Sequence, residues 1–392
     1  MRRVAVVGAS AAGLAAAETL RRAGFDGTLT LVGDEPHAPY DRPPLSKQFL
    51  SGQWTPGRLA LRTPADLDAL GLDLRLGTAA TQLDLTGRTV WLADGSRVPY
   101  DGLIVATGVR PRRLPGDEGA HVLRTLDDAL ALRDRLKPGC RLAVVGAGFL
   151  GAEAAAVARR LGARVTLLEP APVPLAHAVG TEIGRLLSQA HLDHGVELRT
   201  GVTVAEVTGG GVRLAGGEVV EADEVLVAVG ALPNTEWLAD SGLPVGDGVL
   251  CNAYCEAAPG VYAAGDVARW INPLFGASMR IEHRTNAAEQ GMAAARNLLA
   301  APDARRPFAP VPYFWSDQYD MKIQAYGFLR GHDEVTVVDG DLAERRFVAA
   351  YRTGDRLTGA LAVGMPPRAV RPWRQAIAGG AVWQEAAGTP AA

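Results

Sequence analysis

The sequence predicts an α/β protein with two Rossmann-like dinucleotide-binding domains and a small α+β domain at its C-terminal end. A strand, a glycine turn, an alanine-rich helix and a second strand follow one another at residues 2–35 and again at residues 140–170. Their short apolar runs lack polar residues, as is typical of parallel strands covered on both faces. From about residue 310, hydrophobic strands alternate with polar turns, which predicts the third domain.

Length and composition agree with several folded domains. A chain of 392 residues exceeds the ~100–200 residues of one ordinary domain. Its 48% hydrophobic and 21% charged residues are typical of a globular protein. The net charge of −3 provides no overall attraction to nucleic acid, so we expect no nucleic-acid partner.

The cysteines and the apolar runs bear on location. Cys140, Cys251 and Cys255 are too few for a disulfide framework, and no spacing suits zinc, so we expect reduced thiols and no metal site. The apolar run after Met1 is short and broken by glycine, unlike a signal peptide. No apolar run approaches the ~18 residues of a membrane span. We therefore expect a cytoplasmic protein without a membrane partner.

The domain boundaries follow from further strand and turn patterns. Residues 100–108 form another buried-strand pattern, and the prolines at 111–115 place a boundary near residue 112. Residues 260–266 are a strand pattern that ends in Gly-Asp. If this strand joins the first sheet, the second domain is inserted into the first. The predicted domains are residues 1–112 with 244–309 (first dinucleotide-binding domain), 113–243 (second) and 310–392 (C-terminal).

Shorter patterns predict the remaining elements. Alternating polarity at residues 196–200 and 202–207 predicts antiparallel hairpins, and residues 224–230 return to the buried-strand form. The C-terminal region predicts three strands and a late helix, at residues 334–338, 345–352, 357–363 and 371–378.

The second glycine turn has the full G-x-G-x-x-G pattern, with Gly146, Gly148 and Gly151. These glycines permit the turn, the close approach of a pyrophosphate and the packing of helix on strand, while the helix N-terminus faces the phosphates. Glu169 follows Gly146 by 23 positions and ends the next strand, where a carboxylate binds ribose hydroxyls. No arginine follows at 170–172 to bind a 2′-phosphate, so this site favours NADH over NADPH.

The first glycine turn departs from this pattern. It runs from Gly8 to Gly13 with Ser10 in place of the second glycine, and a Cβ at this position opposes the closest approach of a phosphate. We expect Asp34 to bind the ribose, because Asp34 is nearer the strand end than Glu35. The alternative is that both acids are solvated turn residues.

Several motifs in one order resemble a known family. Residues 39–47 (PYDRPPLSK), 106–108 (ATG), 265–266 (GD) and 313–318 (YFWSDQ) are similar to those of the NADH-dependent ferredoxin and rubredoxin reductases of bacterial oxygenase systems. The resemblance covers nearly the whole chain. It implies the glutathione-reductase fold, with FAD in the first domain and NAD in the second. It also implies a small iron–sulfur ferredoxin as partner and, beyond it, a P450 or Rieske oxygenase.

The resemblance also implies site residues. Ala12 and Gly13 would hold the FAD pyrophosphate, Asp34 the adenosine ribose, and Asp266 a ribityl hydroxyl. The flavin side and the cofactor periphery would involve Arg42, Lys47, Ala80 and Arg124. The full set implied for cofactor binding is Gly8, Ala12, Gly13, Asp34, Arg42, Lys47, Ala80, Thr107, Gly108, Arg124, Gly146, Gly148, Leu150, Gly151, Glu169, Gly230, Gly265, Asp266, Arg284 and Trp315.

One position departs from the family pattern. The family usually has His-Trp-Thr-Asn-Ala where this chain has Arg284 after His283. Arginine is tolerable if position 284 touches the flavin through its backbone, whereas a stacking role would be lost.

Lys47, Glu153 and Trp315 are the expected catalytic residues. In the resembled proteins a lysine and a glutamate pair beside flavin N5, where the lysine favours the reduced anionic ring and the glutamate meets the nicotinamide carboxamide. The alternatives are a surface lysine and a helix residue stabilised by the macrodipole. Trp315 is expected near the nicotinamide or flavin, the alternative being a core or interface tryptophan.

The route of the electrons follows from a missing motif. Residues 39–52 lack the cysteine pair of the disulfide-reducing relatives, so electrons leave by another route, and a [2Fe–2S] ferredoxin suits a flavin. The alternatives are a rubredoxin reductase, an NADH oxidase or peroxidase, and a non-catalytic, flavin-bearing signalling or DNA-interacting protein. Between Leu342 and Arg374 there are seven arginines against two acids. They predict a docking patch for an acidic ferredoxin, the alternative being a solvated face.

Overall fold

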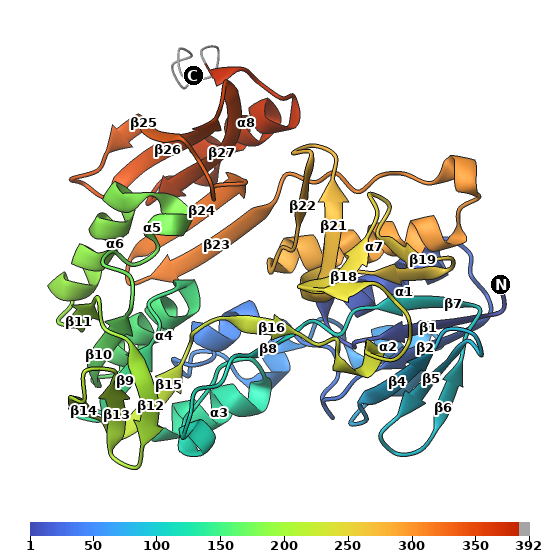
Figure 1. The fold of residues 1–392 in the computed structure, drawn as a ribbon, viewed down its shortest axis with the longest axis horizontal. Helices are drawn as coiled ribbons and strands as arrows, with labels where there is room; N and C mark the ends of the chain where they lie inside the picture. The colour runs from blue at the N-terminus through green and yellow to red at the C-terminus, as the bar shows by residue number, and fades with distance from the viewer. Residues whose placement is uncertain (384–392) are drawn as a thin grey trace. The chain divides into compact units, whose positions relative to one another are not determined.

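The computed structural model describes residues 1–383, and the chain forms two compact units, each assembled from three segments (Figure 1). The first unit comprises Met1–Asp41, Leu59–Arg110 and Leu232–Pro312. The second unit comprises Arg42–Arg58, Pro111–Ala231 and the chain from Tyr313 onward.

A six-stranded sheet forms the centre of the first unit. In spatial order its strands are β19 (Glu256–Ala258), β20 (Val261–Ala263), β7 (Gly102–Val105), β1 (Arg3–Val7), β2 (Thr28–Val32) and β3 (Asp73–Arg75). Strands β20, β7, β1, β2 and β3 are parallel, and β19 is antiparallel to β20. The pairing of β20 with β7 confirms that a distant segment returns to the first sheet, as expected for an inserted second domain.

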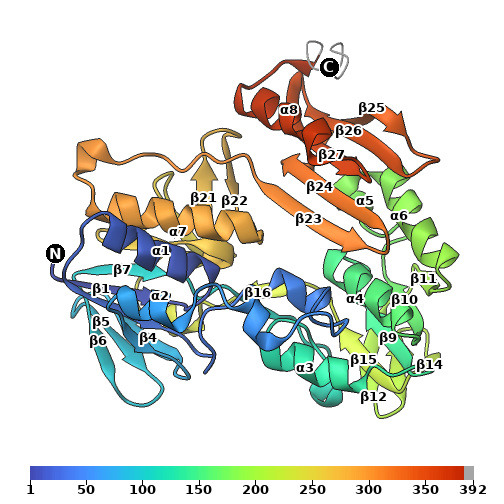
Figure 2. The same ribbon diagram turned by 180° about the vertical axis from the view of Figure 1, so that it is seen from behind.

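Helices α1 (Ala11–Arg22) and α7 (Arg284–Leu299) lie side by side in the first unit (Figure 2). The buried face of α1 consists largely of alanine, including Ala15, Ala16 and Ala17, which permits close packing. A Cβ at Gly291 of α7 would lie 2.2 Å from the carbonyl oxygen of Ala12, so this close approach requires glycine.

Smaller elements complete the first unit. The strands β4 (Ala80–Asp84), β5 (Thr89–Leu92) and β6 (Arg97–Pro99) form an antiparallel sheet. A further sheet contains β17 (Val245–Gly246), β18 (Gly248–Cys251), β21 (Ala268–Asn272) and β22 (Ala277–Met279). The short helix α2 (Pro64–Ala69) begins with a capping box made by Thr63 and Asp66. Strands β8 (Val109–Pro111) and β16 (Ala231–Pro233), at two of the points where the chain passes from one unit to the other, pair with each other.

The second unit contains the other Rossmann-like sheet. Its four parallel strands are, in order, β11 (Glu197–Thr200), β10 (Arg164–Glu169), β9 (Arg141–Val145) and β15 (Glu224–Val227). The helices of this part are α3 (Leu126–Arg135), α4 (Phe149–Arg160), α5 (Ala176–Val179) and α6 (Thr181–Asp193).

The hairpin predicted at residues 196–200 is wrong, because β11 runs parallel to β10. Helix α6 provides the crossover that a parallel connection needs. β11 is an edge strand with no fully buried residue, so its polarity alternates as in a hairpin strand. The hairpin predicted at 202–207 is present: β12 (Val204–Thr208) pairs antiparallel with β13 (Gly211–Leu214), which pairs with β14 (Val219–Glu221).

A five-stranded antiparallel sheet follows from residue 313. Its order is β23 (Tyr313–Gln318), β24 (Met321–Gly327), β27 (Arg356–Val363), β26 (Arg346–Thr353) and β25 (Glu334–Asp341), and α8 (Pro367–Ala378) packs on β24 and β27 (Figure 1). Together with the two Rossmann-like sheets, this sheet and helix confirm the predicted fold class. Side chains of this sheet, such as Ile323 and Phe347, share one hydrophobic cluster with Val179 of α5 and Leu187 of α6.

Among the described residues, no helix is both long and apolar enough to cross a bilayer.

Candidate functional site

The first unit gathers several predicted site residues at one edge of its sheet. The registers Val7 with Val32 and Val7 with Val105 align the carboxyl ends of β1, β2 and β7, and β20 ends beside β7. The segments that leave this edge contain Gly8, Ala12 and Gly13; Asp34; Thr107 and Gly108; and Gly265 and Asp266. Dinucleotides bind at this edge in open parallel sheets.

The glycine turn of the first unit is tightly packed. Gly8 has a φ of +122°, and a Cβ there would lie 2.0 Å from the carbonyl oxygen of Ala106. A Cβ at Gly13 would lie 1.8 Å from the oxygen of Gly8. Ser10 has extended backbone angles (φ −126°, ψ −155°), which any residue adopts, so serine causes no backbone strain here.

Helix α1 begins at this turn with its first amides available to an anion. Ser10 makes no side-chain cap, and the first turn contains no acidic residue. Unpaired amides and the helix dipole at an N-terminus bind phosphate groups. The turn therefore fits the pyrophosphate of a dinucleotide such as FAD.

Asp34 and Glu35 differ in their surroundings. Asp34 is exposed just beyond β2, and its Oδ1 accepts a hydrogen bond from the Glu35 amide at 3.1 Å. Glu35 instead accepts a hydrogen bond from the Tyr40 hydroxyl at 2.5 Å. The carboxylate of Asp34 thus remains more open to a ribose than that of Glu35.

Arg284 has a partner that sequence reasoning missed. It is the first residue of α7 and forms an ion pair with Asp41. A cation at a helix N-terminus is disfavoured by the dipole, and the carboxylate of Asp41 offsets this. Asp41 belongs to the motif at residues 39–47, so this motif was the available signal.

The Thr107–Gly108 segment is held by another residue that sequence reasoning missed. The Thr107 hydroxyl donates to the carbonyl oxygen of Asn234 at 2.8 Å, and the Asn234 amide donates to the oxygen of Thr107 at 2.9 Å. The Asn234 backbone N–H also donates to the Gly108 oxygen. Ala80 begins β4, opposite Leu92.

The second unit repeats the glycine-turn geometry. Gly146 has a φ of +101°, and its Cβ would lie 2.4 Å from the oxygen of Ala228. A Cβ at Gly151 would lie 2.0 Å from the oxygen of Gly146, whereas Gly148 faces open space. Leu150, in the first turn of α4, is 38% exposed. Open space at the middle glycine fits the passage of a pyrophosphate.

Glu169 ends β10 and Gly230 follows β15, and both lie at the same sheet edge as this turn, since β10 and β15 run parallel to β9. The Glu169 carboxylate accepts hydrogen bonds from the amides of Ala147 at 2.9 Å and Ala171 at 3.0 Å. The carboxylate is therefore held beside the glycine turn.

A buried ion pair joins two of the predicted catalytic residues. The Lys47 Nζ lies 2.6 Å from Glu153 Oε2, and their side chains are only 9% and 5% exposed. Lys47 follows the single-turn helix η1 (Pro43–Ser46), and Glu153 lies in α4. Lys47 is thus not a surface lysine.

Two serines complete the surroundings of Glu153. Ser46 Oγ donates to Glu153 Oε2 at 2.5 Å, and Ser316 Oγ donates to Oε1 at 2.6 Å. Lys47 is the third donor, and all three are buried. Sequence reasoning missed both serines, although each adjoins a residue that it selected, Lys47 or Trp315.

Trp315 is not part of this buried cluster. On β23 it alternates with Ser316 and so points to the opposite face of the strand. Its half-buried ring stacks near Tyr313, with centroids 6.0 Å apart.

Two other predicted site residues, Arg42 and Arg124, are in contact: Arg42 Nη1 donates to the Arg124 carbonyl oxygen at 2.7 Å.

The cysteines are free thiols, and two of them are deeply buried. Burial raises the pKa of Cys255 to about 12 and raises that of Cys251 further still. Within residues 1–383, no group of three or more His, Cys, Asp or Glu side chains is arranged to hold a metal ion.

Comparison with known proteins shows the family to which the chain belongs. The family described as pyridine nucleotide-disulphide oxidoreductase matches residues 2–291, and a reductase C-terminal domain matches residues 313–390. The ferredoxin–NAD(+) reductase component of the anthranilate 1,2-dioxygenase system from Burkholderia cepacia is 40% identical, over 96% of this chain and 94% of that protein. Rhodocoxin reductase from Rhodococcus erythropolis is 38% identical, over 93% of this chain and 86% of that protein.

A solved structure agrees with these relatives. The structure of the covalent putidaredoxin reductase–putidaredoxin complex superposes with a TM-score of 0.92 at 34% identity, covering 99% of this chain and 96% of that one. The family resemblance predicted from the motifs is confirmed. The chain therefore belongs to the pyridine nucleotide-disulphide oxidoreductase family, as one of its ferredoxin–NAD(+) reductases.

Proposed function

We propose that this chain takes electrons from NADH and passes them, through FAD, to a small [2Fe–2S] ferredoxin that serves a cytochrome P450 or a Rieske oxygenase. The observation that supports this best is the buried Lys47–Glu153 pair in the unit that also contains the Gly146–Gly151 turn. Two named relatives support the same acceptor, since one is a component of a dioxygenase system and the other was solved in complex with putidaredoxin.

We assign FAD to the first Rossmann-like sheet and NADH to the second. The corresponding domains would be residues 1–112 with 244–309 for FAD, 113–243 for NAD and 310–392 for the C-terminal part. FAD would be bound by Gly8, Ala12, Gly13, Asp34, Arg42, Lys47, Ala80, Thr107, Gly108, Arg124, Gly265, Asp266, Arg284 and Trp315. NADH would be bound by Gly146, Gly148, Leu150, Gly151, Glu169 and Gly230.

The protein's own contribution is binding and orientation. FAD, when bound, accepts two electrons together and releases them one at a time. Glu153 orients the nicotinamide carboxamide. Lys47 places a positive charge beside the flavin, where it favours the reduced anionic ring. No residue needs to transfer a proton, since hydride transfer requires only that the rings be positioned.

Exposed positive charge on α8 supports a docking site for the electron acceptor. Arg345 pairs with Asp193 and Arg352 with Glu334, so these two arginines are neutralised. On α8 three arginines one turn apart are exposed and form no salt bridge within the described part of the chain: Arg368, Arg371 and Arg374. We define these three as the α8 arginine face, and we assign the docking of the acidic ferredoxin to it.

Anaerobic stopped-flow reduction of the protein by NADH, followed by a cytochrome c assay with and without ferredoxin, tests the function. A ferredoxin reductase reduces cytochrome c fast only when ferredoxin is present. An NADH oxidase of the same fold would instead consume NADH with oxygen at the same rate without ferredoxin. Replacing ferredoxin by a rubredoxin distinguishes the remaining variant, a rubredoxin reductase.

We also place this reaction in the cytoplasm. The three free cysteines support this location, because thiols persist in a reducing compartment.

A further inference from the structure

A chain of buried polar groups leads away from Glu153. Ser316 donates its only hydroxyl proton to Glu153 Oε1 at 2.6 Å, and Gln318 Nε2 donates to Ser316 Oγ at 3.3 Å. Ser316 and Gln318 are two positions apart on β23, so both side chains point to the same face of the strand. Both residues are 0% exposed.

The chain reaches a buried histidine on α6. His191 is 3% exposed, and its Nδ1 lies 2.8 Å from the Tyr319 hydroxyl. Its Nε2 and the Oε1 of Gln318 are both buried, and neither has a well-aligned partner within the described residues. Buried polar atoms in folded proteins are normally paired, and here one atom can donate and the other can accept.

Gln318 lies close to His191. Burial lowers the pKa of His191 to about 4, and the nearby Gln318 side chain opposes this effect. The ring is therefore neutral at pH 7, with one nitrogen that donates and one that accepts.

The charge of Glu153 determines the direction of every hydrogen bond in the chain. An ionised carboxylate only accepts, so the Ser316 proton is committed to Glu153. Ser316 Oγ must then accept from Gln318 Nε2, which turns Gln318 Oε1 toward His191. Because Gln318 Oε1 can only accept, His191 Nε2 must carry the ring proton. The Tyr319 hydroxyl then donates to His191 Nδ1.

We propose that Gln318 and His191 are positioning residues that hold the Glu153 carboxylate through Ser316, and that Glu153 in turn keeps His191 in its Nε2-protonated tautomer. The effect on the reaction with NADH rests on the proposed function. The His191 tautomer does not depend on that function. Hydrogen bonds aligned in one direction polarise and strengthen one another. The C-terminal sheet would thus orient a carboxylate of α4, the helix that follows the Gly146–Gly151 turn.

The tautomer is measured by ¹⁵N-histidine NMR on the FAD-bound protein, with His191→Gln identifying the signal. We expect the Nε2-protonated form in the wild type. Gln318→Leu removes the acceptor, so the ring should then populate both tautomers. Ser188→Ala is the matched control, since Ser188 lies on the same helix and its hydroxyl donates to the Gly184 carbonyl oxygen. An Nδ1-protonated ring in the wild type, or one that ignores Gln318→Leu, overturns the proposal.

The positioning role is measured by single-turnover reduction with NADH. Ser316→Ala should lower the limiting rate of flavin reduction about tenfold, as expected for loss of one hydrogen bond to a charged group, while the Kd for NADH changes less than about twofold. Gln318→Leu should lower the same rate, because Ser316 then loses the donor that aligns it. Ser316→Thr keeps the hydroxyl and should restore the rate. Equal rates in Ser316→Ala and wild type overturn the positioning role. A wild type that NADH does not reduce would refute the proposed function and leave the tautomer result standing.

Discussion

Lys47 and Glu153 are 106 positions apart in the sequence, yet their charged groups are 2.6 Å apart and shielded from solvent. A buried pair of this kind costs desolvation energy, and its two members depend on each other. Removal of either partner leaves an uncompensated buried charge or an unfilled space.

We expect Lys47→Ala to slow reduction by NADH at least tenfold while FAD stays bound, because the pyrophosphate and ribose contacts that we assign lie elsewhere. The uncompensated Glu153 should also lower the free energy of unfolding by about 3–5 kcal/mol. Stopped-flow absorbance and urea unfolding measure the two effects. Lys137→Ala, at an exposed lysine of the same unit, is the control and should change neither. Unchanged reduction in Lys47→Ala would remove the lysine from the site.

NADH should be preferred strongly over NADPH, because Glu169 holds a negative charge over the glycine turn. Glu169→Ala should narrow the ratio of the two kcat/KM values, since it removes both the repulsion of a 2′-phosphate and the ribose contact. Glu197→Ala, at an exposed carboxylate on the neighbouring strand β11, should leave the ratio unchanged. Comparable kcat/KM values for the two nucleotides in the wild type would contradict this assignment.

The α8 arginine face should make the association with ferredoxin fast and sensitive to salt. Exposed charges are screened within about 8 Å at physiological ionic strength, so the KM for ferredoxin should rise with salt. Reversal of Arg371 and Arg374 to glutamate should raise this KM about tenfold or more. Arg97→Glu, on β6 of the first unit, is the control, and NADH-to-FAD reduction should stay constant throughout. A ferredoxin KM that ignores both salt and the α8 reversals would exclude this surface.

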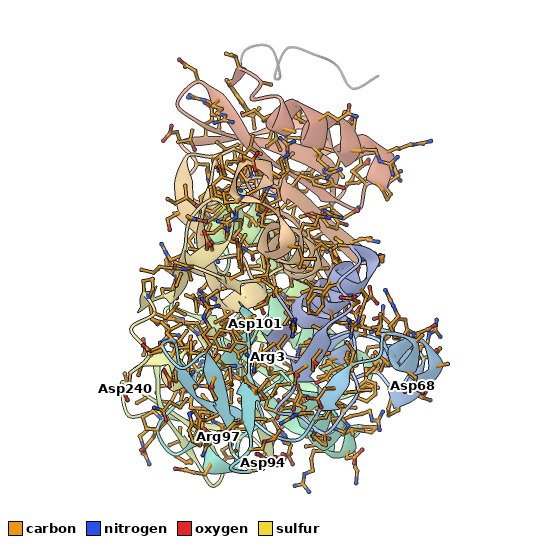
Figure 3. All side chains as sticks on the ribbon, turned by 90° about the vertical axis from the view of Figure 1, so that its right-hand side faces the viewer. Arg3, Asp68, Asp94, Arg97, Asp101 and Asp240 are labelled. Carbon is orange, nitrogen blue, oxygen red and sulfur yellow. The ribbon has the colours of Figure 1, made fainter. Side chains whose placement is uncertain are left out.

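Acid should remove one stabilising contact of the first sheet. The Arg2 amide, the Arg3 guanidinium and the Arg3 amide bind the Asp101 carboxylate and lower its pKa to about 2, from an ordinary 3.8 (Figure 3). A lowered folded-state pKa contributes stability above pH 4 that is lost as the pH falls to 2.

Asp101→Asn should therefore lower the Tm at pH 7 by roughly 2 °C or less, given the partial exposure of the pair, and the difference should vanish near pH 2. Asp68→Asn, at an exposed site on α2, is the control, and thermal unfolding across this pH range is the measurement. A difference that persists at pH 2 would show that the carboxylate charge is not its cause.

Local patterns were sufficient to predict the two Rossmann-like sheets. Glycines at turns with positive φ, such as Gly8 and Gly146, and buried strands such as β1 and β9 are determined by short stretches of sequence. Parallel strands align their carboxyl ends at one edge of a sheet, and Asp34 and Asp266 each follow such a strand. The sequence pattern indicated the strand before Asp266, but its pairing with the first sheet was only conditional, and the role of Asp266 came from the family resemblance. The prediction for β11 was wrong because an exposed edge strand has no distinctive polarity pattern.

The surroundings of Glu153 could not be predicted from local patterns. Ser46, Ser316 and His191 come from three segments that only tertiary packing brings together, and serine has no signal of its own at either position. The same is true of Asp41 as the partner of Arg284. Charge counting likewise could not separate Arg345, which is paired with Asp193, from the exposed arginines of α8.

The hydrophobic cluster shared by α5, α6 and the C-terminal sheet has a consequence for biosynthesis. The first unit has all its residues once Pro312 has left the ribosome, whereas the second unit still lacks five strands. Until these strands are made, the apolar face of α6, with Ile183 and Leu187, remains uncovered. Nascent chains that stop near residue 312 should therefore recruit chaperones or aggregate, even though their first unit can already fold.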